Sequence, residues 1–366
     1  MNVILSEIKN HIGIITLNSE RSLNSLSLEM VEGILTLLDK WKQDDSIKSV
    51  FLQGSGEKAF CAGGDIRQMR QAIIEQQKID PTQVPQKCAD FFEKEYLLDY
   101  TIHTYAKPII VWADGIVMGG GLGLLAGASH RIVTERSKLA MPEITIGLYP
   151  DVGASYFLNQ MPSAYGLYLG MTATRFDGAD ALFLNLADYH IDAAHKQALL
   201  QDLTQLSWSN TPSEDIDLLL QKHSSKDIPT SQAQENESII QEFESVKDTL
   251  AFSELLQKHA CENTWVNAGY QIFKSGSPSS AFVIFKQIKD NKGKSLEQAF
   301  KSELNLSCQC SIHPDFPEGV RALLIDKDLS PKWQPSSLDK VSPEWVESYF
   351  TPLWLENEHP FKDLGK

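Results

Sequence analysis

The stretch Lys107–Leu124, KPIIVWADGIVMGGGLGL, decides the fold of this chain. It opens with an apolar, β-branched run at 108–113 whose continuous hydrophobicity is typical of a strand buried on both faces. Three glycines at 119–121 follow, and the apolar residues after them fit a buried helix. A strand, a turn and a helix in this order are typical of α/β proteins.

The rest of the chain extends this pattern in both directions. Residues 2–9 and 12–17 predict a β-hairpin, and apolar residues at helical spacing predict a helix from Ser27 to about Trp41. Strands and helices alternate up to about residue 195, and helical patterns dominate beyond it. We therefore expect three parts, which are a catalytic core at 1–205, a polar linker or insertion at 206–240 and a helical C-terminal region at 241–366.

The composition of the 366-residue chain excludes several classes of protein. A formal net charge of −15 argues against nucleic-acid binding, which needs a basic face. The five cysteines show no disulfide framework and the N-terminus shows no leader pattern, so we expect a reducing compartment, the cytoplasm. The apolar stretch 108–129 approaches the length of a membrane span, but its glycines favour a strand, a turn and a buried helix.

Two glycine-rich segments are candidates for binding an oxyanion. The glycines at 119–121 begin a helix, where backbone N–H groups lack intrahelical partners and carry the positive end of the helix dipole. Gly64 precedes Asp65, a potential helix cap, so its N–H group is also free to face a ligand. Taken alone, each segment fits close packing or a turn equally well.

Two carboxylates lie eight positions apart in MPEITIGLYPDVG at 141–153. Glu143 has apolar neighbours, so burial is expected to raise its pKa. Asp151 precedes a helical pattern, where the helix dipole is expected to keep it ionised. Two acids in unlike surroundings commonly divide the roles of acid and base, although a simple helix cap explains either residue alone.

The combination of these motifs resembles a known family. RSLNSLSLEM at 21–30, KAFCAGGDI at 58–66, the stretch at 107–124 and MPEITIGLYPDVGASYFL at 141–158 are similar in order and spacing to the enoyl-CoA hydratase/isomerase (crotonase) superfamily. The resemblance implies an α/β fold, a crotonase-like spiral of ββα units with a helical C-terminal region. The run at 313–333 resembles the tail of the family's hydrolases of short 3-hydroxyacyl-CoA thioesters.

The resemblance also implies roles for particular residues. The N–H groups of Gly64 and Gly120 would hold the thioester oxygen, and Glu143 and Asp151 would be the catalytic acids. Glu95 would contact the substrate, together with Gly120, Glu143 and Asp151. Residues near the coenzyme A nucleotide would be Arg21, Lys58 and Ala62.

Two positions separate this chain from the hydratases of the family. Hydratases carry a catalytic glutamate where this sequence has Gly123, and a glycine where it has Asp151. This exchange favours hydrolysis of a 3-hydroxyacyl-CoA, foremost 3-hydroxyisobutyryl-CoA in valine breakdown, over hydration. An acyl-CoA substrate and a homo-oligomer fit the resemblance. We expect no metal, no cofactor beyond the coenzyme A of the substrate, no nucleic acid and no membrane.

Three other functions remain open on the sequence. The first is an enoyl-CoA hydratase or isomerase with the same fold. The second is an acyl-CoA binder without turnover. The third is a nicotinamide-dependent dehydrogenase, because Gly121-x-Gly123-x-x-Ala126 matches the dinucleotide fingerprint in form. Asp114-Gly115 lies between the predicted strand and those glycines, whereas the fingerprint follows its strand directly, which argues against the dehydrogenase.

Overall fold

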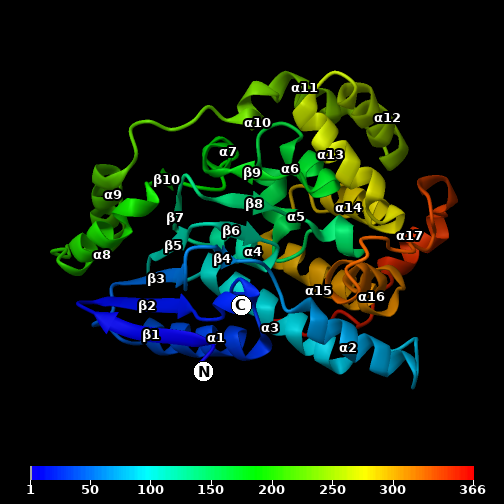
Figure 1. The fold of residues 1–366 in the computed structure, drawn as a ribbon. Helices are drawn as coiled ribbons and strands as arrows, with labels where there is room; N and C mark the ends of the chain where they lie inside the picture. Colours follow the sequence, from blue (N-terminus) through cyan, green and yellow to red (C-terminus); the bar gives the residue numbers. More distant parts are fainter. Residues whose placement is uncertain (1) are drawn as a thin grey trace. The chain divides into compact units, whose positions relative to one another are not determined.

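The computed structural model describes residues 2–366, which fold into two compact units (Figure 1). Each unit is built from three separate stretches of the chain. The first unit comprises the residues up to Gly64, Leu97–Ala140 and Arg175–Glu235. The second unit comprises Asp65–Tyr96, Met141–Thr174 and Asn236–Lys366. The chain therefore returns to each unit, and residues distant in sequence meet within it.

The larger sheet of the first unit has six strands in the order β1-β2-β3-β5-β7-β10. Strand β1 pairs antiparallel with β2, and the remaining neighbours pair in parallel. The predicted hairpin is confirmed, and its turn residues Asn10 and His11 have positive φ angles. The strands are β1 (Ile4–Lys9), β2 (Ile12–Leu17), β3 (Ser49–Gly54), β5 (Ile109–Ala113), β7 (His130–Val133) and β10 (Tyr189–His190).

A smaller sheet in the same unit carries both glycine-rich segments. Its order is β4-β6-β8-β9, in which β9 alone runs antiparallel to its neighbour. Because β4 and β6 pair in parallel, the glycines that follow the two strands leave the sheet at the same edge. The strands are β4 (Ala59–Cys61), β6 (Ile116–Met118), β8 (Lys138–Ala140) and β9 (Phe176–Asp177).

The core of the first unit forms around β5, which is buried at every residue, as its apolar sequence predicts. Ile110 and Trp112 belong to one hydrophobic cluster with Ile216 and Leu220 of α9, a helix that lies within the range 206–240. The helices of this unit are η1 (Glu20–Ser22), α1 (Leu28–Lys42), α4 (Gly120–Ala126), α7 (Gly178–Phe183), η4 (Ala193–His195), α8 (Lys196–Thr204), α9 (Pro212–His223) and α10 (Gln232–Glu235).

The second unit is helical, and polar side chains cap several of its helices. Asn263 and Ser295 each accept a hydrogen bond from the backbone N–H three residues later, as expected of N-caps. Helix α3 (Gln86–His103) begins in this unit and ends in the first. The other helices are α2 (Ile66–Gln77), η2 (Glu143–Ile146), α5 (Ala154–Phe157), η3 (Leu158–Gln160), α6 (Tyr165–Thr172), α11 (Glu237–Glu242), η5 (Phe243–Ser245), α12 (Thr249–Ala260), α13 (Thr264–Ser275), α14 (Pro278–Asp290), α15 (Leu296–Ile312), α16 (Asp315–Val320), η6 (Arg321–Ile325), η7 (Leu338–Lys340) and α17 (Pro343–Tyr349).

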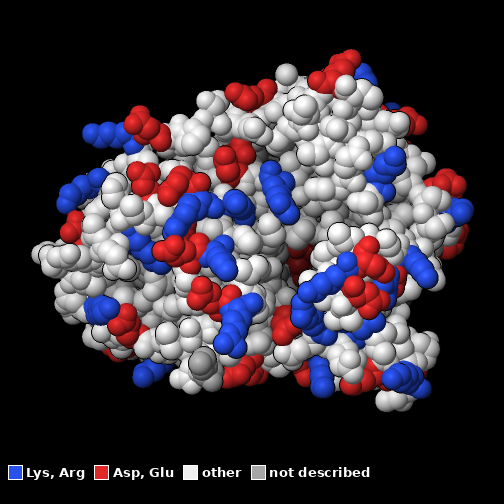
Figure 2. Space-filling model, viewed as in Figure 1, with Lys and Arg blue, Asp and Glu red and all other residues white. Residues whose placement is uncertain are grey.

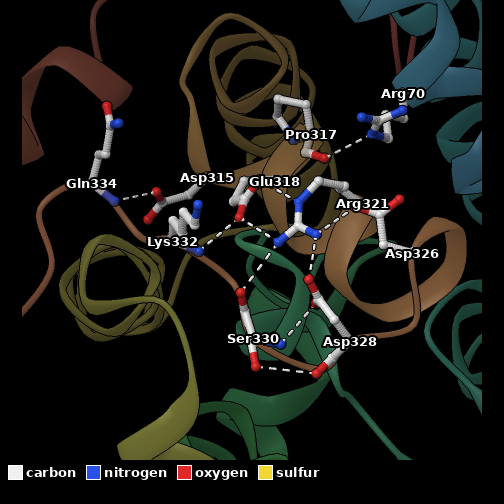
Figure 3. Close-up of polar contacts among 10 residues, drawn as sticks. All are labelled: Arg70, Asp315, Pro317, Glu318, Arg321, Asp326, Asp328, Ser330, Lys332 and Gln334. Carbon is white, nitrogen blue, oxygen red and sulfur yellow. Dashed lines mark hydrogen bonds and ion pairs between the residues drawn. The ribbon is translucent and has the colours of Figure 1, made fainter.

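The tail motif at 313–333 is closed into a compact loop by ion pairs around Arg321 (Figure 3). The guanidinium lies 2.8 Å from Glu318 and 2.7 Å from both Asp326 and Asp328. Glu318 also accepts a hydrogen bond from the backbone N–H of Lys332, at 2.7 Å. Several bonds to one planar guanidinium favour a single loop conformation, so the acidic residues of this motif have a structural role.

Acidic and basic side chains are interspersed over the face shown in Figure 2. Some charged side chains of the protein form ion pairs, as between Arg131 and Asp188, whose side chains lie 2.6 Å apart. The apolar stretch 108–129 is divided into β5, β6 and α4, as expected from its glycines. Within residues 2–366, no helix combines the length and the apolarity that a bilayer span requires.

We predict that Gly121→Ala destabilises the protein, because helix α4 lies directly on β4 at this position. An added Cβ atom would lie 2.3 Å from the backbone oxygen of Cys61, which cannot turn aside. Overpacking of this kind costs about 1–3 kcal/mol, measurable as a lower urea midpoint. Gly33→Ala is the matched control, because its Cβ would meet only the mobile end of Ile4. Equal midpoints for the two variants would contradict this account.

Candidate active site

The first unit brings together the two loops that carry the predicted oxyanion glycines. A Cβ atom placed on Gly63 would lie 3.7 Å from the backbone nitrogen of Gly120, so the loops after β4 and β6 are in contact. Gly63 has φ +101 and Gly119 has φ +50, a backbone conformation that favours glycine at both positions. The close approach of the two backbones therefore depends on these residues.

Local hydrogen bonds hold both loops in place. The carbonyl of Gly63 accepts a hydrogen bond from Leu26 N–H at 2.8 Å, and Gly119 N–H donates to Ala140 at 3.3 Å. Gly120 is the first residue of α4, where a backbone N–H has no partner within the helix. Among residues 2–366, the N–H groups of Gly64 and Gly120 donate to no other residue. Each is therefore available to a ligand oxygen.

The residues predicted to bind coenzyme A also lie in the first unit. Ala62 N–H donates to the Leu23 carbonyl at 3.1 Å, which joins the loop after β4 to the loop that carries Arg21. Arg21 lies in η1 and is exposed. Lys58 is also exposed, directly before β4. The structure thus places two exposed cations on the segments that flank the Gly64 loop.

The second unit buries the three predicted acids. Glu95 on α3 is 3% exposed, Glu143 at the start of η2 is 4% exposed, and Asp151 before α5 is 5% exposed. The charge of Asp151 raises the pKa of both glutamates, after the larger effect of burial. Such mutual influence requires the carboxyl groups to lie close together.

Burial raises the pKa of Glu143 well above its ordinary value, which confirms the expectation from its apolar neighbours. Burial also raises the pKa of Asp151, to about 6, although hydrogen bonds from Tyr96 and the backbone oppose the shift. We expected the helix dipole to keep Asp151 ionised. A pKa of about 6 leaves it mostly ionised at neutral pH, but burial raises this pKa where the dipole would have lowered it. Helix α5 has only four residues, and its dipole does not offset desolvation.

Burial raises the pKa of all three acids, and repulsion from the charge of Asp151 adds to the shift of the two glutamates. Glu95 Oε1 and Glu143 Oε2 are buried and have no hydrogen-bond partner among the described residues. Buried acceptors without partners are costly, and they mark a place where a ligand supplies the missing contacts.

Sequence reasoning missed the residues that contact these acids. The Tyr96 hydroxyl donates to Asp151 at 2.6 Å and lies 2.5 Å from Ser307 Oγ on α15. Glu303, also on α15, accepts hydrogen bonds from the backbone N–H groups of Gly153 and Ser155. A tyrosine beside a glutamate and a mid-helix serine give no functional signal by type or spacing. These contacts appear only once the chain is folded.

Comparison with known proteins places the chain among acyl-CoA enzymes. The family model described as enoyl-CoA hydratase/isomerase matches residues 12–350. The mitochondrial 3-hydroxyisobutyryl-CoA hydrolase of Danio rerio is 38% identical over 96% of this chain and 90% of its own length. That of Gallus gallus is 37% identical over 93% and 86%. The crystal structure of a carnitinyl-CoA dehydratase from Mycobacterium thermoresistibile is 30% identical and covers 99% of this chain and 100% of its own, with a TM-score of 0.88.

These relatives correct the expected location. We expected the cytoplasm, but the Danio rerio and Gallus gallus hydrolases are named as mitochondrial proteins. The expectation was wrong because cysteine usage separates reducing from oxidising compartments and does not separate one reducing compartment from another.

The comparisons confirm the predicted fold class, with parallel sheets and a helical C-terminal region. They also agree with the motif order at 21–158, because the matched range extends across all of these segments. The chain belongs to the enoyl-CoA hydratase/isomerase family.

Proposed function

We propose that this protein hydrolyses a short 3-hydroxyacyl-CoA thioester, foremost 3-hydroxyisobutyryl-CoA, to the hydroxy acid and coenzyme A in valine breakdown. The observation that carries the proposal is the buried cluster of Glu95, Glu143 and Asp151, in which one oxygen of each glutamate has no hydrogen-bond partner among the described residues. The names of the curated relatives agree with this reaction. An aspartate at 151 and a glycine at 123 further favour hydrolysis over hydration.

The proposal assigns the thioester oxygen to the N–H groups of Gly64 and Gly120. A carbonyl carbon under attack places negative charge on this oxygen, and two fixed donors stabilise that charge. One donor of this kind contributes about 3 kcal/mol to the transition state. Support comes from the adjacency of the two loops and from the absence of other acceptors for these amides among residues 2–366.

Glu143 is assigned to the attack, in one of two ways. As a nucleophile, its carboxylate bonds to the carbonyl carbon, the C–S bond breaks, and the thiolate leaves and takes a proton. Water then hydrolyses the mixed anhydride, which restores Glu143 and releases the hydroxy acid. As a general base, Glu143 instead takes a proton from a water molecule that attacks directly. Either route requires ionised Glu143, so its raised pKa makes the reaction slower in acid.

Asp151 and Glu95 are assigned to proton transfer and substrate selection. Asp151 is assigned to orient water or the substrate hydroxyl and to accept a proton. Glu95 contributes a buried oxygen that lacks a partner, which a 3-hydroxyl group would satisfy. An acyl chain without the hydroxyl would leave this oxygen unpaired, at a cost in transition-state binding.

Coenzyme A binding is assigned to Arg21, Lys58 and the backbone of Ala62. Both cations are exposed and suit the phosphates of the nucleotide. The reaction as written needs water and the four assigned groups Gly64, Gly120, Glu143 and Asp151, and it uses no metal or redox cofactor.

An enoyl-CoA hydratase is the second candidate, since a solved relative is a dehydratase of an acyl-CoA. Hydratase chemistry uses two glutamates to hold and split one water molecule. Gly123 lies within α4 and has no side chain for the first of these roles. Loss of the 263 nm absorbance of crotonyl-CoA would identify hydration, whereas release of free thiol identifies hydrolysis.

We predict that Glu143→Gln lowers kcat for thiol release from 3-hydroxyisobutyryl-CoA by at least about 100-fold. Asp151→Asn is expected to lower kcat by about 10-fold or more, because an amide cannot accept the proton. Glu356→Gln, at an exposed acid, is the control and should retain full activity. Full activity in both site variants would refute the assignment.

We also predict that Glu95→Leu reduces selectivity for hydroxylated substrates. Leucine keeps most of the buried volume and removes the unpaired oxygen, so an acyl chain without a hydroxyl no longer loses binding energy. The ratio of kcat/KM for 3-hydroxyisobutyryl-CoA to that for isobutyryl-CoA should fall by about 10-fold or more. An unchanged ratio would show that Glu95 does not recognise the hydroxyl.

A further inference from the structure

A chain of buried hydroxyl groups connects Asp151 to helix α15 within the second unit. Tyr96 Oη lies 2.6 Å from Asp151 Oδ2 and 2.5 Å from Ser307 Oγ. Ser307 Oγ lies 2.8 Å from Tyr149 Oη, which in turn lies 2.8 Å from the backbone oxygen of Glu303. Tyr96, Tyr149 and Ser307 are fully buried. No solvent group competes for these contacts, so they form one continuous network.

The number of protons in this network fixes its direction. Ionised Asp151 only accepts hydrogen bonds, so the single proton of Tyr96 points to Asp151. Ser307 must then donate to Tyr96, Tyr149 donates to the Glu303 carbonyl, and no proton is left for the contact between Ser307 and Tyr149. Protonated Asp151 would supply the missing proton and reverse the order. The direction of the network therefore depends on the charge of Asp151, and the donor that meets the charged carboxylate is Tyr96.

The same helix also holds the backbone that follows Asp151. Val152 has φ +56, which is strained for a β-branched residue, and Gly153 has φ +84. The Glu303 carboxyl group accepts hydrogen bonds from Gly153 N–H at 2.7 Å, Ser155 N–H at 2.9 Å and Ser155 Oγ–H at 2.5 Å. Glu303 and Ser307 are one turn apart on α15, so one helix face fixes both the backbone and the side chain of this acid.

We propose that Tyr96 and Ser307 are positioning residues for hydrolysis, which aim the Asp151 carboxylate and favour its ionised form. This inference rests on the proposed function of Asp151. The hydrogen bond from Tyr96 lowers the pKa of Asp151, against the larger effect of burial. Other groups that face Asp151 act through their charges or desolvation, and they are Glu95 on α3, Glu143 on η2, Tyr149 before α5, and Glu303 and Cys310 on α15.

The test is Tyr96→Phe, which removes one hydroxyl and keeps a ring that packs 5.8 Å from Phe92 and 6.1 Å from Phe300 between centroids. We expect kcat to fall by about 10- to 100-fold with little change in KM, as for loss of a hydrogen bond to a charged group. The loss also raises the pKa of Asp151, so the acidic limb of the pH–rate profile moves to higher pH. Ser307→Ala should shift the limb in the same direction by less, and it serves as the second variant if Tyr96→Phe does not fold.

Tyr105→Phe is the matched control, because it removes a tyrosine hydroxyl that donates to the Leu38 carbonyl in the first unit. It should leave the acidic limb in place. In an Asp151→Asn background, Tyr96→Phe should cause no further loss of kcat. An unmoved limb in both Tyr96→Phe and Ser307→Ala, or an equal loss of kcat in both backgrounds, would overturn this inference. Full activity of Asp151→Asn alone would instead refute the proposed role of Asp151, on which this inference rests.

Discussion

The burial of three carboxyl groups together in the second unit is the constraint on which the account depends. Glu95, Glu143 and Asp151 each lose solvent, and a charge on one disfavours charge on the others. A fold that buries such groups must either pair them with cations or leave them partly protonated. In this chain, burial raises the pKa of all three acids, which favours partial protonation. One oxygen of Glu95 and one of Glu143 also have no hydrogen-bond partner among the described residues. These oxygens are therefore available to a ligand.

The two units supply different chemistry from different elements. Paired parallel strands β4 and β6 present backbone amides at one sheet edge, which requires glycine and no particular side chain. The acids instead depend on side chains and on support from α15, which belongs to the C-terminal region and not to the glycine motifs. Tyr96 and Ser307 form part of the hydrogen-bonded network that a buried aspartate needs.

Sequence patterns predicted the features that arise locally. The apolar run at 108–113 gave β5, the periodicity after Ser27 gave α1, and the neighbours of Glu143 gave the direction of its pKa shift. Features that arise from tertiary packing were missed. The pKa of Asp151 depends on burial, which its own neighbours do not reveal, and Tyr96 contacts Ser307 across 211 positions. Helix α9 was overlooked because short polar and turn-forming stretches around it concealed the spacing of Ile216 and Leu220.

The raised pKa of the buried acids is the central physical claim, and carbon-13 NMR of protein labelled at the aspartate and glutamate carboxyl carbons measures it directly. Spectra of Asp151→Asn and Glu143→Gln assign the two signals. We predict that Asp151 titrates with a pKa of about 6 and that the pKa of Glu143 lies well above its ordinary value. Titration of both signals near the ordinary values of 3.8 and 4.5 would contradict the account, because acids that ionise freely are neither buried nor coupled.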